Sequence, residues 1–446
     1  MDSAHYATAK DIVAKLTQAG FVAYFAGGWV RDYLRGSPHD DIDIATSATP
    51  EEIIQLFPKT TGLEGKCFGV VRVLQNHHAY EVATFRSDGD YHDGRHPSSV
   101  RFASPQEDAQ RRDFTINGLF FDPEKNQVID FVNGTADLKN KLIRAIGDPL
   151  ARFREDKLRL LRAVRFATTL GFQIEPSTWQ AICHLAPEIT RISPERIRDE
   201  LNKILTSESP VRGLDLLDSS GLLKAILPEI EALKGVQQPP QFHPEGDVYV
   251  HTRLMLSHLS RPSLTLALST LFHDVGKKAT YSLDPVGRIR FSGHEHVGAR
   301  ITERVLRRLR YSNEIIETVT ACVQNHMTFK DAPQMRLSKL KRLLARPTFD
   351  EELDLHRIDC LSSHGDLSIY EFLVQRRQAL SQEEISPPRL ITGHDLIRLG
   401  LSPGPQIGRL LEEIREAQLE GQLSTPEQAL DYARNRLRSL SNPTSP

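Results

Sequence analysis

Two aspartates one residue apart, in the segment Asp41-Ile42-Asp43-Ile44, have the chemistry and spacing to hold divalent cations. On a β-strand, alternate side chains point to opposite faces, so both carboxylates would project from one face and both isoleucines from the other. The two aspartate Cα atoms would then lie roughly 6.5–7 Å apart. Carboxylates at this spacing can share hard cations that also bind phosphate oxygens. The segment therefore predicts a strand with a metal site, although Asp-x-Asp pairs also occur in many loops that bind no metal.

A pair of glycines, Gly27-Gly28, lies shortly before this segment. We expect them to form a turn between a strand over residues 21–26 and a helix over residues 29–35. The N–H groups of such a turn, with the helix N-terminus, can bind a triphosphate. Any tight turn also favours glycine, so the pair alone is weak. A phosphate-binding turn followed at short range by a metal-binding strand is much more specific.

A second set of metal-binding residue types lies between about residues 245 and 375, a region expected to be helical and rich in histidine. Imidazole and carboxylate groups together suit Mn, Fe, Co, Ni or Zn, and could hold one or two ions. The adjacent pair His273-Asp274 is the most specific part of this set.

Asp156 and Arg159 are three residues apart, which on a helix places their side chains on a shared face. An ionised aspartate only accepts hydrogen bonds, and an arginine only donates them. The pair can therefore satisfy the Watson–Crick edge of cytosine or adenine, whereas uracil and guanine present the reverse pattern. Buried polar groups left unpaired would penalise the wrong base. The alternative is a salt bridge on a helix surface.

The elements that must position these residues form an α/β domain followed by helices. After Gly147-Asp148-Pro149 the β-rich segments end, and the apolar pattern predicts one helix over Phe153–Leu170 that stops at Gly171. The stretch over residues 234–244 reads as a linker. The other expected strands cover residues 41–44, 70–74, 79–85 and 100–103, and the other expected helices cover residues 50–57 (starting at Thr49-Pro50), 179–185, 194–205, 211–217 and, in a last helical segment, 391–438.

The composition excludes several classes of protein. No apolar run approaches the ~20 residues that span a bilayer, and the first 16 residues resemble neither a signal peptide nor a transit peptide. The four cysteines form no Cys-x-x-Cys pair, which argues against disulfides and thiolate zinc sites and for a reducing, cytoplasmic setting. The net charge of −2 does not indicate nucleic-acid binding, but the basic stretches over residues 152–165 and 301–347 could follow phosphates.

Several motifs together resemble the class II nucleotidyltransferase superfamily, which includes bacterial CCA-adding enzymes and bacterial poly(A) polymerases. Gly27-Gly28-x-Val30-Arg31-Asp32 followed by Asp41-x-Asp43 resembles its catalytic signature. Arg111 to Asn117 resembles the second motif, residues 148–159 the base-reading helix, and residues 192–200 the neck motif. Residues 391–396 with Pro403-Gly404-Pro405 are similar to the tail. These matches lie in order over almost the whole chain.

The resemblance implies template-independent addition of CCA, or of its terminal A, to the 3′ end of tRNA, with CTP and ATP as substrates and no membrane association. It implies Mg²⁺ at Asp41 and Asp43 with support from Glu81. The histidine series resembles HD phosphohydrolases, which implies an accessory site for a transition metal such as Mn²⁺, Ni²⁺ or Co²⁺. The ligands that this resemblance implies, with His296 as an alternative to His294, are His251, His273, Asp274, His294, His326 and Asp359. The alternative is a retained fold whose metal site has degraded. The expected nucleotide-binding residues are Gly27, Gly28, Arg31, Arg112, Asp113, Asn117, Asp156, Arg159, Arg162 and Arg165.

The implied organisation has four parts. Residues 1–145 would form the α/β catalytic head, and residues 146–240 a helical neck for base recognition and RNA binding. Residues 245–375 would form the HD domain, and residues 385–446 a helical tail that binds tRNA. The oligomeric state stays open.

Three alternatives to a full CCA-adding enzyme also stay open: an enzyme that adds only A, a poly(A) polymerase, and a phosphohydrolase that acts mainly through the HD site. Residues 65–71 resemble the Gly-x-x-Phe-Gly-Thr segment of CCA-type enzymes, with Val70 in place of Thr. Residues 87–97 resemble the loop that lets these enzymes switch to A, which argues against an enzyme that adds only C.

Overall fold

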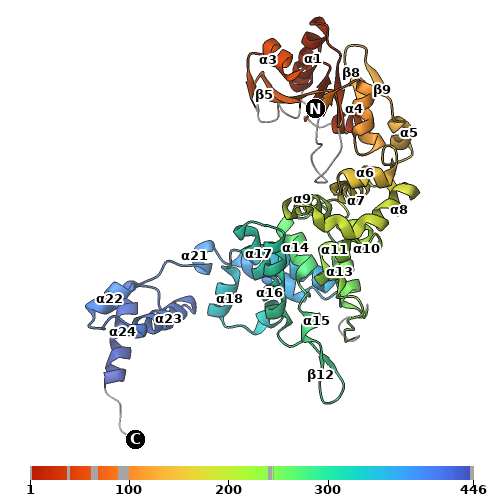
Figure 1. The fold of residues 1–446 in the computed structure, drawn as a ribbon. Coiled ribbons are helices and arrows are strands. Elements are labelled where there is room, and N and C mark those ends of the chain that lie inside the picture. Colours follow the sequence, from red (N-terminus) through yellow and green to blue (C-terminus); the bar gives the residue numbers. More distant parts are fainter. Residues whose placement is uncertain are drawn as a thin grey trace. The chain divides into compact units, whose positions relative to one another are not determined.

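The structure is a computed structural model that describes residues 3–37, 41–61, 69–88, 100–239, 244 and 246–441. The chain divides into two compact units, and their helices and strands are labelled in Figure 1. The first unit comprises Met1–Glu231 with Leu259–Leu264 and Arg307–Tyr311, and the second comprises Ala232–His258, Thr265–Leu306 and Ser312–Pro446. None of the helices in the described ranges is both long and apolar enough to cross a membrane.

The first unit contains a mixed sheet whose described strands run in the order β3-β4-β5-β2-β1-β8-β9. Strands β2 and β5 are parallel, and the other neighbours are antiparallel. The sequence did not lead us to expect β8 and β9. A separate hairpin pairs β6 (Arg86–Asp88) with β7 (Val100–Phe102). The strands of the sheet are β1 (Ala23–Ala26), β2 (Asp43–Thr46), β3 (Thr60–Thr61), β4 (Val70–Gln75), β5 (His78–Thr84), β8 (Leu119–Asp122) and β9 (Gln127–Asp130).

One face of the sheet is buried by α1 (Ser3–Gln18), α2 (Gly28–Leu34) and α3 (Pro50–Leu56). Helix α3 begins as predicted, because Thr49 and Glu52 form a reciprocal capping box with Pro50 at the first helical position. The apolar side chains of this face form one cluster that includes Ile12, Phe25, Trp29, Ile44, Val82 and Phe121. On the other face, a smaller cluster joins Ala26, Ala45, Phe85 and Phe120 to Ala109 of α4 (Pro105–Arg111).

The expectation of one helix over Phe153–Leu170 is wrong. The segment forms α6 (Pro149–Glu155) and α7 (Leu158–Leu170), and Asp156 between them has an extended backbone with φ −139°. The Asp156 carboxylate accepts a hydrogen bond from the N–H of Leu158 at 3.0 Å, which replaces a helical bond and starts a new helix. Helix α7 ends at Gly171, as predicted, with φ 70°. The remaining helices of this unit are α5 (Gly134–Lys139), α8 (Pro176–Leu185), α9 (Pro194–Leu205), α10 (Pro210–Ser219), α11 (Leu222–Ile226) and α12 (Pro228–Glu231).

The described residues of the second unit are almost entirely helical, with one short hairpin of β12 (Ser282–Leu283) and β13 (Ile289–Arg290). The segment expected to be helical over residues 391–438 forms three helices that share an apolar cluster around Leu396, Ile414 and Ala433. The helices are α13 (Val248–Ser257), α14 (Leu264–Phe272), α15 (Lys277–Thr280), α16 (His294–Arg308), α17 (Asn313–Asn325), α18 (Leu337–Leu344), α19 (Phe349–Ser362), α20 (Ser368–Ala379), α21 (Gln382–Ile385), α22 (Gly393–Arg398), α23 (Pro405–Leu419) and α24 (Pro426–Ser441).

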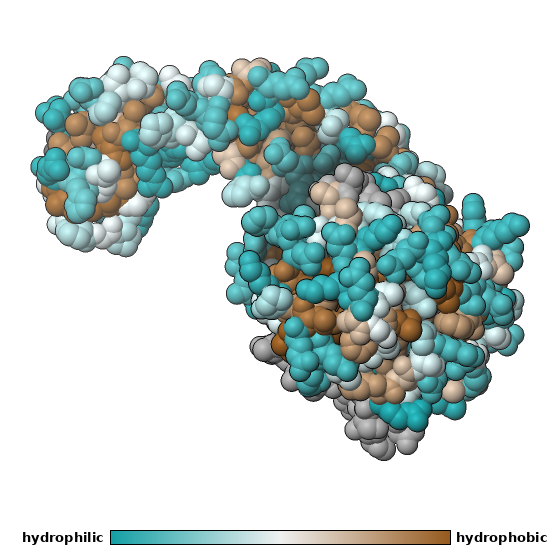
Figure 2. Space-filling view, turned by 90° about the horizontal axis from the view of Figure 1, so that it is seen from above, coloured by the Kyte–Doolittle hydropathy of each residue, from teal (hydrophilic) through white to brown (hydrophobic). Residues whose placement is uncertain are grey.

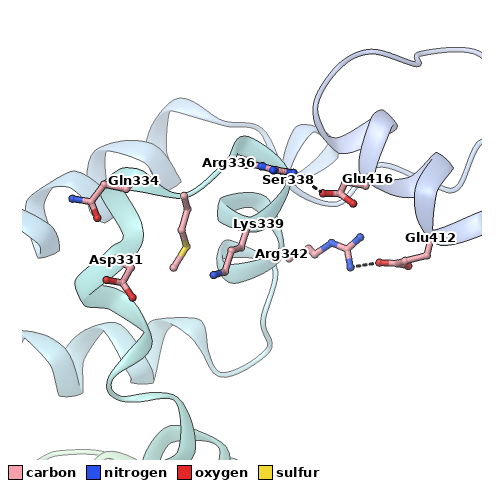
Figure 3. Close-up of a pocket in the computed structure, with 9 residues that line it drawn as sticks. Asp331, Gln334, Arg336, Ser338, Lys339, Arg342, Glu412 and Glu416 are labelled. Atoms are coloured by element: carbon pink, nitrogen blue, oxygen red, sulfur yellow. Dashed lines mark ion pairs between the residues drawn. The ribbon is translucent and has the colours of Figure 1, made fainter. Parts of the chain in front are cut away.

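A cleft of about 630 Å³ lies between α18 and α23 in the second unit (Figure 3). Its lining carries surface ion pairs, with Arg342 directed at Glu412 and Arg336 at 3.7 Å from Glu416. Exposed pairs of this kind contribute at most about 1 kcal/mol each. Hydrophilic residues also cover much of the surface in the view of Figure 2, as expected for a chain with 26% charged residues. The cleft contains none of the predicted site residues.

Candidate active site and candidate metal centre

Most of the predicted catalytic and nucleotide-binding residues line one cleft of about 490 Å³ in the first unit. The cleft is strongly charged, since seven arginines and four aspartates face it. Such an arrangement suits a ligand that carries both phosphates and a polar base. The lining residues are Gly27, Gly28, Trp29, Arg31, Asp41, Asp43, Arg111, Arg112, Asp113, Asn117, Asp156, Leu158, Arg159, Arg162, Arg165, Phe166 and Arg196.

Asp41 and Asp43 face this cleft together. Ile42 and Ile44 are buried in the main core, and Asp41 and Asp43, which alternate with them, are exposed. The alternation predicted from the sequence is therefore present, although β2 begins at Asp43 and Asp41 lies just before it. The result is a pair of carboxylates on one face of the sheet, which is the donor set that hard divalent cations prefer.

Gly27 lies against this pair and cannot readily be replaced. It caps α2 with φ 68° and ψ −131°, a conformation that residues with a side chain rarely adopt. A Cβ atom here would lie 3.0 Å from Nη1 of Arg112 and 4.0 Å from Oδ2 of Asp43. The glycine predicted for a phosphate-binding turn thus keeps the backbone close to both the arginine and the carboxylate.

Changing Gly27 to Ala should lower kcat/KM for nucleotide addition by about tenfold or more, since the new Cβ displaces Arg112 as well as straining the backbone. Gly36→Ala is the matched control. Gly36 also has a positive φ, of 74°, but no described atom lies within 4 Å of its Cβ position. Steady-state kinetics and thermal melts of both variants test this. Equal losses of activity in the two variants would mean that backbone strain alone explains the effect.

Glu81 lies on β5 beside β2, as predicted. Ile44 of β2 pairs with Val82 of β5 in parallel. If this pairing continues for one more residue toward the N-terminus, Glu81 lies next to Asp43 on the same face of the sheet. The Glu81 carboxylate, however, is ion-paired with Arg72 of β4 at 2.7 Å, and both side chains are about half exposed. A supporting role for Glu81 at the metal pair stays a prediction.

A chain of hydrogen bonds connects the residues expected to bind the nucleotide. Arg31 donates to Asn117 Oδ1 at 2.7 Å, and the Asn117 amide donates to Asp113 at 3.0 Å. Arg162 donates to the other oxygen of Asp113 at 2.5 and 2.8 Å. Burial raises the pKa of Asp113, but Arg162 and the amide of Asn117 outweigh it and hold the value at about 2. The ionised Asp113 therefore fixes a rigid polar wall of the cleft.

Asp108 is a residue that the sequence analysis missed. Its side chain is buried and receives bonds from Arg111 at 2.7 Å and from Arg112 at 3.0 Å. Burial raises the pKa of Asp108, but the two guanidiniums outweigh this and lower it. Because one carboxylate orients both arginines, Asp108 positions Arg112 beside Gly27. A signal was present, since an aspartate three and four residues before two arginines favours a shared ion pair on a helix.

Asp156 and Arg159 both face the cleft but are not held as one helix pair. Asp156 binds Arg196 of α9 at 2.8 and 3.4 Å. Arg159 binds Glu155 at 2.6 Å and donates to the carbonyl of Arg152 at 2.8 Å. The premise of a common helix face is wrong, because the chain leaves the helix at Asp156. An acceptor and a donor nevertheless line the same cleft. Arg196 lies in the segment that resembles the neck motif, residues 192–200, but the sequence did not predict its ion pair with Asp156.

The second set of predicted metal ligands converges in the second unit. Two groups of three share Asp274, with all ligand atoms in each group within 4.8 Å of one another. The carboxylate of Asp359 lies 3.1 Å from Nε2 of His251 and joins the same cluster. The first group is His251, His273 and Asp274, and the second is Asp274, His294 and His326.

The geometry of α16 distinguishes His294 from His296. Residues two apart on an α-helix point about 200° apart, so only one of them can face the cluster. Nε2 of His294 lies 3.2 Å from Nε2 of His326 and 3.4 Å from Asp274. The side chain of His296 is 61% exposed. His294 is therefore the member of the cluster.

Three of the histidines present Nε2 to the centre of the cluster. Nδ1 of His273, His294 and His326 lies 2.6–2.9 Å from the backbone carbonyl three residues earlier. Such a contact places the proton on Nδ1 and leaves the Nε2 lone pair for a metal. Burial also lowers the pKa of His326 to about 4. Within the described chain, the buried Nε2 of His273 and Oδ1 of Asp274 have no hydrogen-bond partner, which a bound cation would supply.

Lys277 is a second residue that was not foreseen here. Its Nζ lies 2.7 Å from Asp274 and 2.6 Å from the side-chain oxygen of Gln238, and the lysine is buried. It is the first residue of α15 and lies three residues after Asp274. The loop before Lys277 is held close to α16, since a Cβ on Gly276 would lie 2.1 Å from the carbonyl oxygen of His294. This close approach positions Asp274 and Lys277 beside the cluster.

Two predicted segments lie wholly or partly outside the described residues. Residues 65–68 of the Gly-x-x-Phe-Gly segment and residues 89–97 of the loop that resembles the A-switching loop are not described, and neither is His96. Of the expected linker, residues 234–239 and 244 are described. The roles of the two segments stay predictions.

Three family models match successive parts of the chain. The poly A polymerase head domain matches residues 23–144. The RNA- and SrmB-binding site of polymerase A matches residues 171–234, and tRNA nucleotidyltransferase domain 2 matches residues 296–433.

Curated relatives and solved structures agree with these matches. A CCA-adding enzyme of Geobacillus stearothermophilus is 47% identical over 218 residues, which is 49% of this chain and 53% of that protein. A CCA-adding enzyme of Lactiplantibacillus plantarum is 34% identical over 442 residues, which is 97% of this chain and 96% of that protein. The crystal structure of the Bacillus stearothermophilus CCA-adding enzyme in complex with CTP matches with a TM-score of 0.71 and 27% identity, over 99% of each chain. A Thermotoga maritima CCA-adding enzyme, complexed with tRNA, shares the fold with a TM-score of 0.59 and 21% identity, over 96% of this chain and 94% of that one.

Proposed function

We infer the function of this chain from its family, because the chain belongs to the CCA-adding tRNA nucleotidyltransferases. We propose that it adds CCA to the 3′ ends of tRNA, using CTP and ATP and releasing pyrophosphate. The observation that carries this is one cleft with the Asp41–Asp43 pair, the arginine-rich wall and the Asp156 and Arg159 side chains. Poly(A) polymerase and A-only activities are not favoured, since the relatives matched over nearly their full length are CCA-adding enzymes.

Family membership implies the use of a divalent metal, and we assign it to Asp41 and Asp43. Their oxygen donors fit Mg²⁺, which prefers carboxylates together with substrate phosphates. Such an ion, when bound, supplies positive charge that activates a hydroxyl and offsets the charge of a leaving phosphate. The arginines around Asp113 and Asn117 would orient the sugar and triphosphate. The RNA 3′-hydroxyl would then attack the α-phosphorus, and pyrophosphate would leave.

We assign selection of the base to Asp156 and Arg159. Arg196 holds the Asp156 carboxylate, so its acceptor lone pairs have a fixed direction. A cytosine or adenine amino group can donate to this carboxylate, and Arg159 can donate to the adjacent ring nitrogen. A uracil or guanine carbonyl in that place would face a carboxylate oxygen, which costs about 1–3 kcal/mol or more when the groups are buried.

Replacing Asp156 with Ala should therefore reduce discrimination against UTP and GTP by about tenfold or more. Single-turnover incorporation of each of the four nucleotides into a tRNA that ends at CC, with the 3′ ends sequenced, measures this. A thermal melt identifies any loss of fold. Wild-type levels of misincorporation in a folded variant would mean that another pair of side chains recognises the base.

A second activity is favoured by the cluster in the second unit. Histidine Nε2 atoms gathered around a shared carboxylate suit a transition metal such as Mn²⁺, Ni²⁺ or Co²⁺. We propose that this cluster hydrolyses phosphate esters. His251, His273, Asp274, His294, His326 and Asp359 would hold one or two ions. A water or hydroxide at such a centre is a nucleophile for phosphate esters at neutral pH.

One experiment tests the main proposal. tRNAs that end at the discriminator base, at C and at CC are each supplied with CTP, ATP or both, and their 3′ ends are sequenced. Completion of CCA from the discriminator base is the expected result. Addition of A alone to the CC-ended tRNA would identify an A-adding enzyme, and long A tails would identify a poly(A) polymerase.

A further inference from the structure

Three guanidinium groups in the wall of the first unit's cleft surround the ring of Phe166. The Cζ atom of Arg165 lies 3.9 Å from the ring centroid, that of Arg31 5.1 Å and that of Arg162 5.4 Å. All three distances are within the ~6 Å range of a cation–π contact. Phe166 itself is 5% exposed and lines the same cleft. One aromatic ring is thus a shared neighbour of three positive charges.

Each of these arginines also has its own acidic partner. Arg31 pairs with Asp32 at 2.6 Å and Arg162 with Asp113 at 2.5 Å. Arg165 pairs with Glu200 of α9 at 2.6 Å. The acids come from three separate segments of the chain, and Asp32 also pairs with Arg35 at 3.2 Å. None of these three pairs explains why the guanidiniums converge.

The ring offers a physical reason for the convergence. Guanidiniums gathered in one wall repel one another, and partial removal from water strengthens this repulsion. The faces of a phenylalanine ring carry negative potential and attract cations, whereas an aliphatic side chain of similar size does not. A wall whose charges are already in place loses less conformational freedom when it binds a polyanion.

We propose that Phe166 is a positioning residue for the nucleotide: its ring holds Arg31, Arg162 and Arg165 in the arrangement that receives the sugar and triphosphate. This inference rests on the proposed function of the cleft. It requires no contact between Phe166 and the substrate. Because the triphosphate is common to CTP and ATP, the effect of the ring should be the same for both nucleotides.

Phe166→Leu removes the ring with little change in volume, and Phe166→Tyr keeps it. Phe57→Leu is the matched control. Phe57 is buried in the main core of the same unit and Lys15 lies 4.8 Å from its ring centroid, but Phe57 does not line the cleft. Steady-state kinetics with MgCTP and MgATP on tRNA are combined with calorimetric binding of inorganic tripolyphosphate in the absence of RNA. Thermal melts accompany both measurements.

Phe166→Leu should raise the KM of both nucleotides and weaken tripolyphosphate binding by about tenfold, with kcat changed by less than about threefold. Phe166→Tyr should stay close to wild type, and Phe57→Leu should melt earlier with an unchanged KM. The proposal is overturned if Phe166→Leu leaves KM and tripolyphosphate binding within about twofold of wild type, or if Phe57→Leu raises KM as much. Wild-type protein that binds tripolyphosphate but extends no tRNA would refute the proposed function and leave the binding comparison valid.

Discussion

Nucleotide addition should fall by about three orders of magnitude or more when either Asp41 or Asp43 is changed to Ala. Metal-ion stabilisation of a developing charge contributes several kcal/mol, and each loss of about 1.4 kcal/mol lowers the rate tenfold. Both carboxylates are exposed on the cleft while their isoleucine neighbours pack in the core. Their removal should therefore leave the fold and the binding of tRNA almost unchanged.

The test compares both alanine variants with Asp43→Asn, which keeps the shape and removes the charge. Glu124→Gln, an exposed acid in the turn between β8 and β9, controls for a general loss of charge. Single-turnover addition of C and A, a filter-binding assay with tRNA, and a thermal melt are measured on each protein. Turnover of Asp41→Ala comparable to that of wild type would show that the metal pair has been assigned wrongly.

Phosphate-ester hydrolysis in the presence of a transition metal should disappear when His273 and Asp274 are both changed to Ala, while CCA addition survives. Asp274 is shared by both groups of ligands, and His273 belongs to one of them, so the double variant disrupts both. The cluster lies wholly in the second unit and the nucleotide cleft wholly in the first. The two sites share no residue, so we expect polymerisation to require nothing from the cluster.

The readouts are hydrolysis of a 2′,3′-cyclic nucleotide with Mn²⁺, Ni²⁺ or Co²⁺ and nucleotide addition with Mg²⁺, on one preparation. His294→Ala and His296→Ala form a matched pair, since only His294 faces the cluster. Loss of hydrolysis is expected in the first and wild-type hydrolysis in the second. Metal ligands also stabilise a fold, so melts are needed. Loss of addition in a double variant that melts like wild type would show that the sites are coupled, and no hydrolysis by wild type would identify a degraded site.

The sequence by itself determined the features that depend on neighbours along the chain. The alternation of acid and isoleucine from Asp41 to Ile44 placed both carboxylates on one face, because strand side chains alternate regardless of the rest of the fold. The start of α3 at Thr49-Pro50 and the end of α7 at Gly171 followed from local capping chemistry. The order of the histidines and aspartates also predicted the members of the metal cluster, apart from the choice between His294 and His296.

Only the tertiary structure decided which of these groups meet. Arg31 and Asn117 are bonded across 86 residues of chain, and no local periodicity encodes such a contact. The prediction that Asp156 and Arg159 share a helix face was wrong, because it assumed a continuous helix that the Asp156 carboxylate itself interrupts. The partner of Asp156 is instead Arg196 of α9. His294 was separated from His296 by the direction of α16 toward His326. Phe166 reads as one more apolar position of a helix in the sequence, and its three arginines become visible only after Arg31 is brought beside α7. Local patterns determine which face a side chain occupies, whereas long-range packing determines what that face contacts.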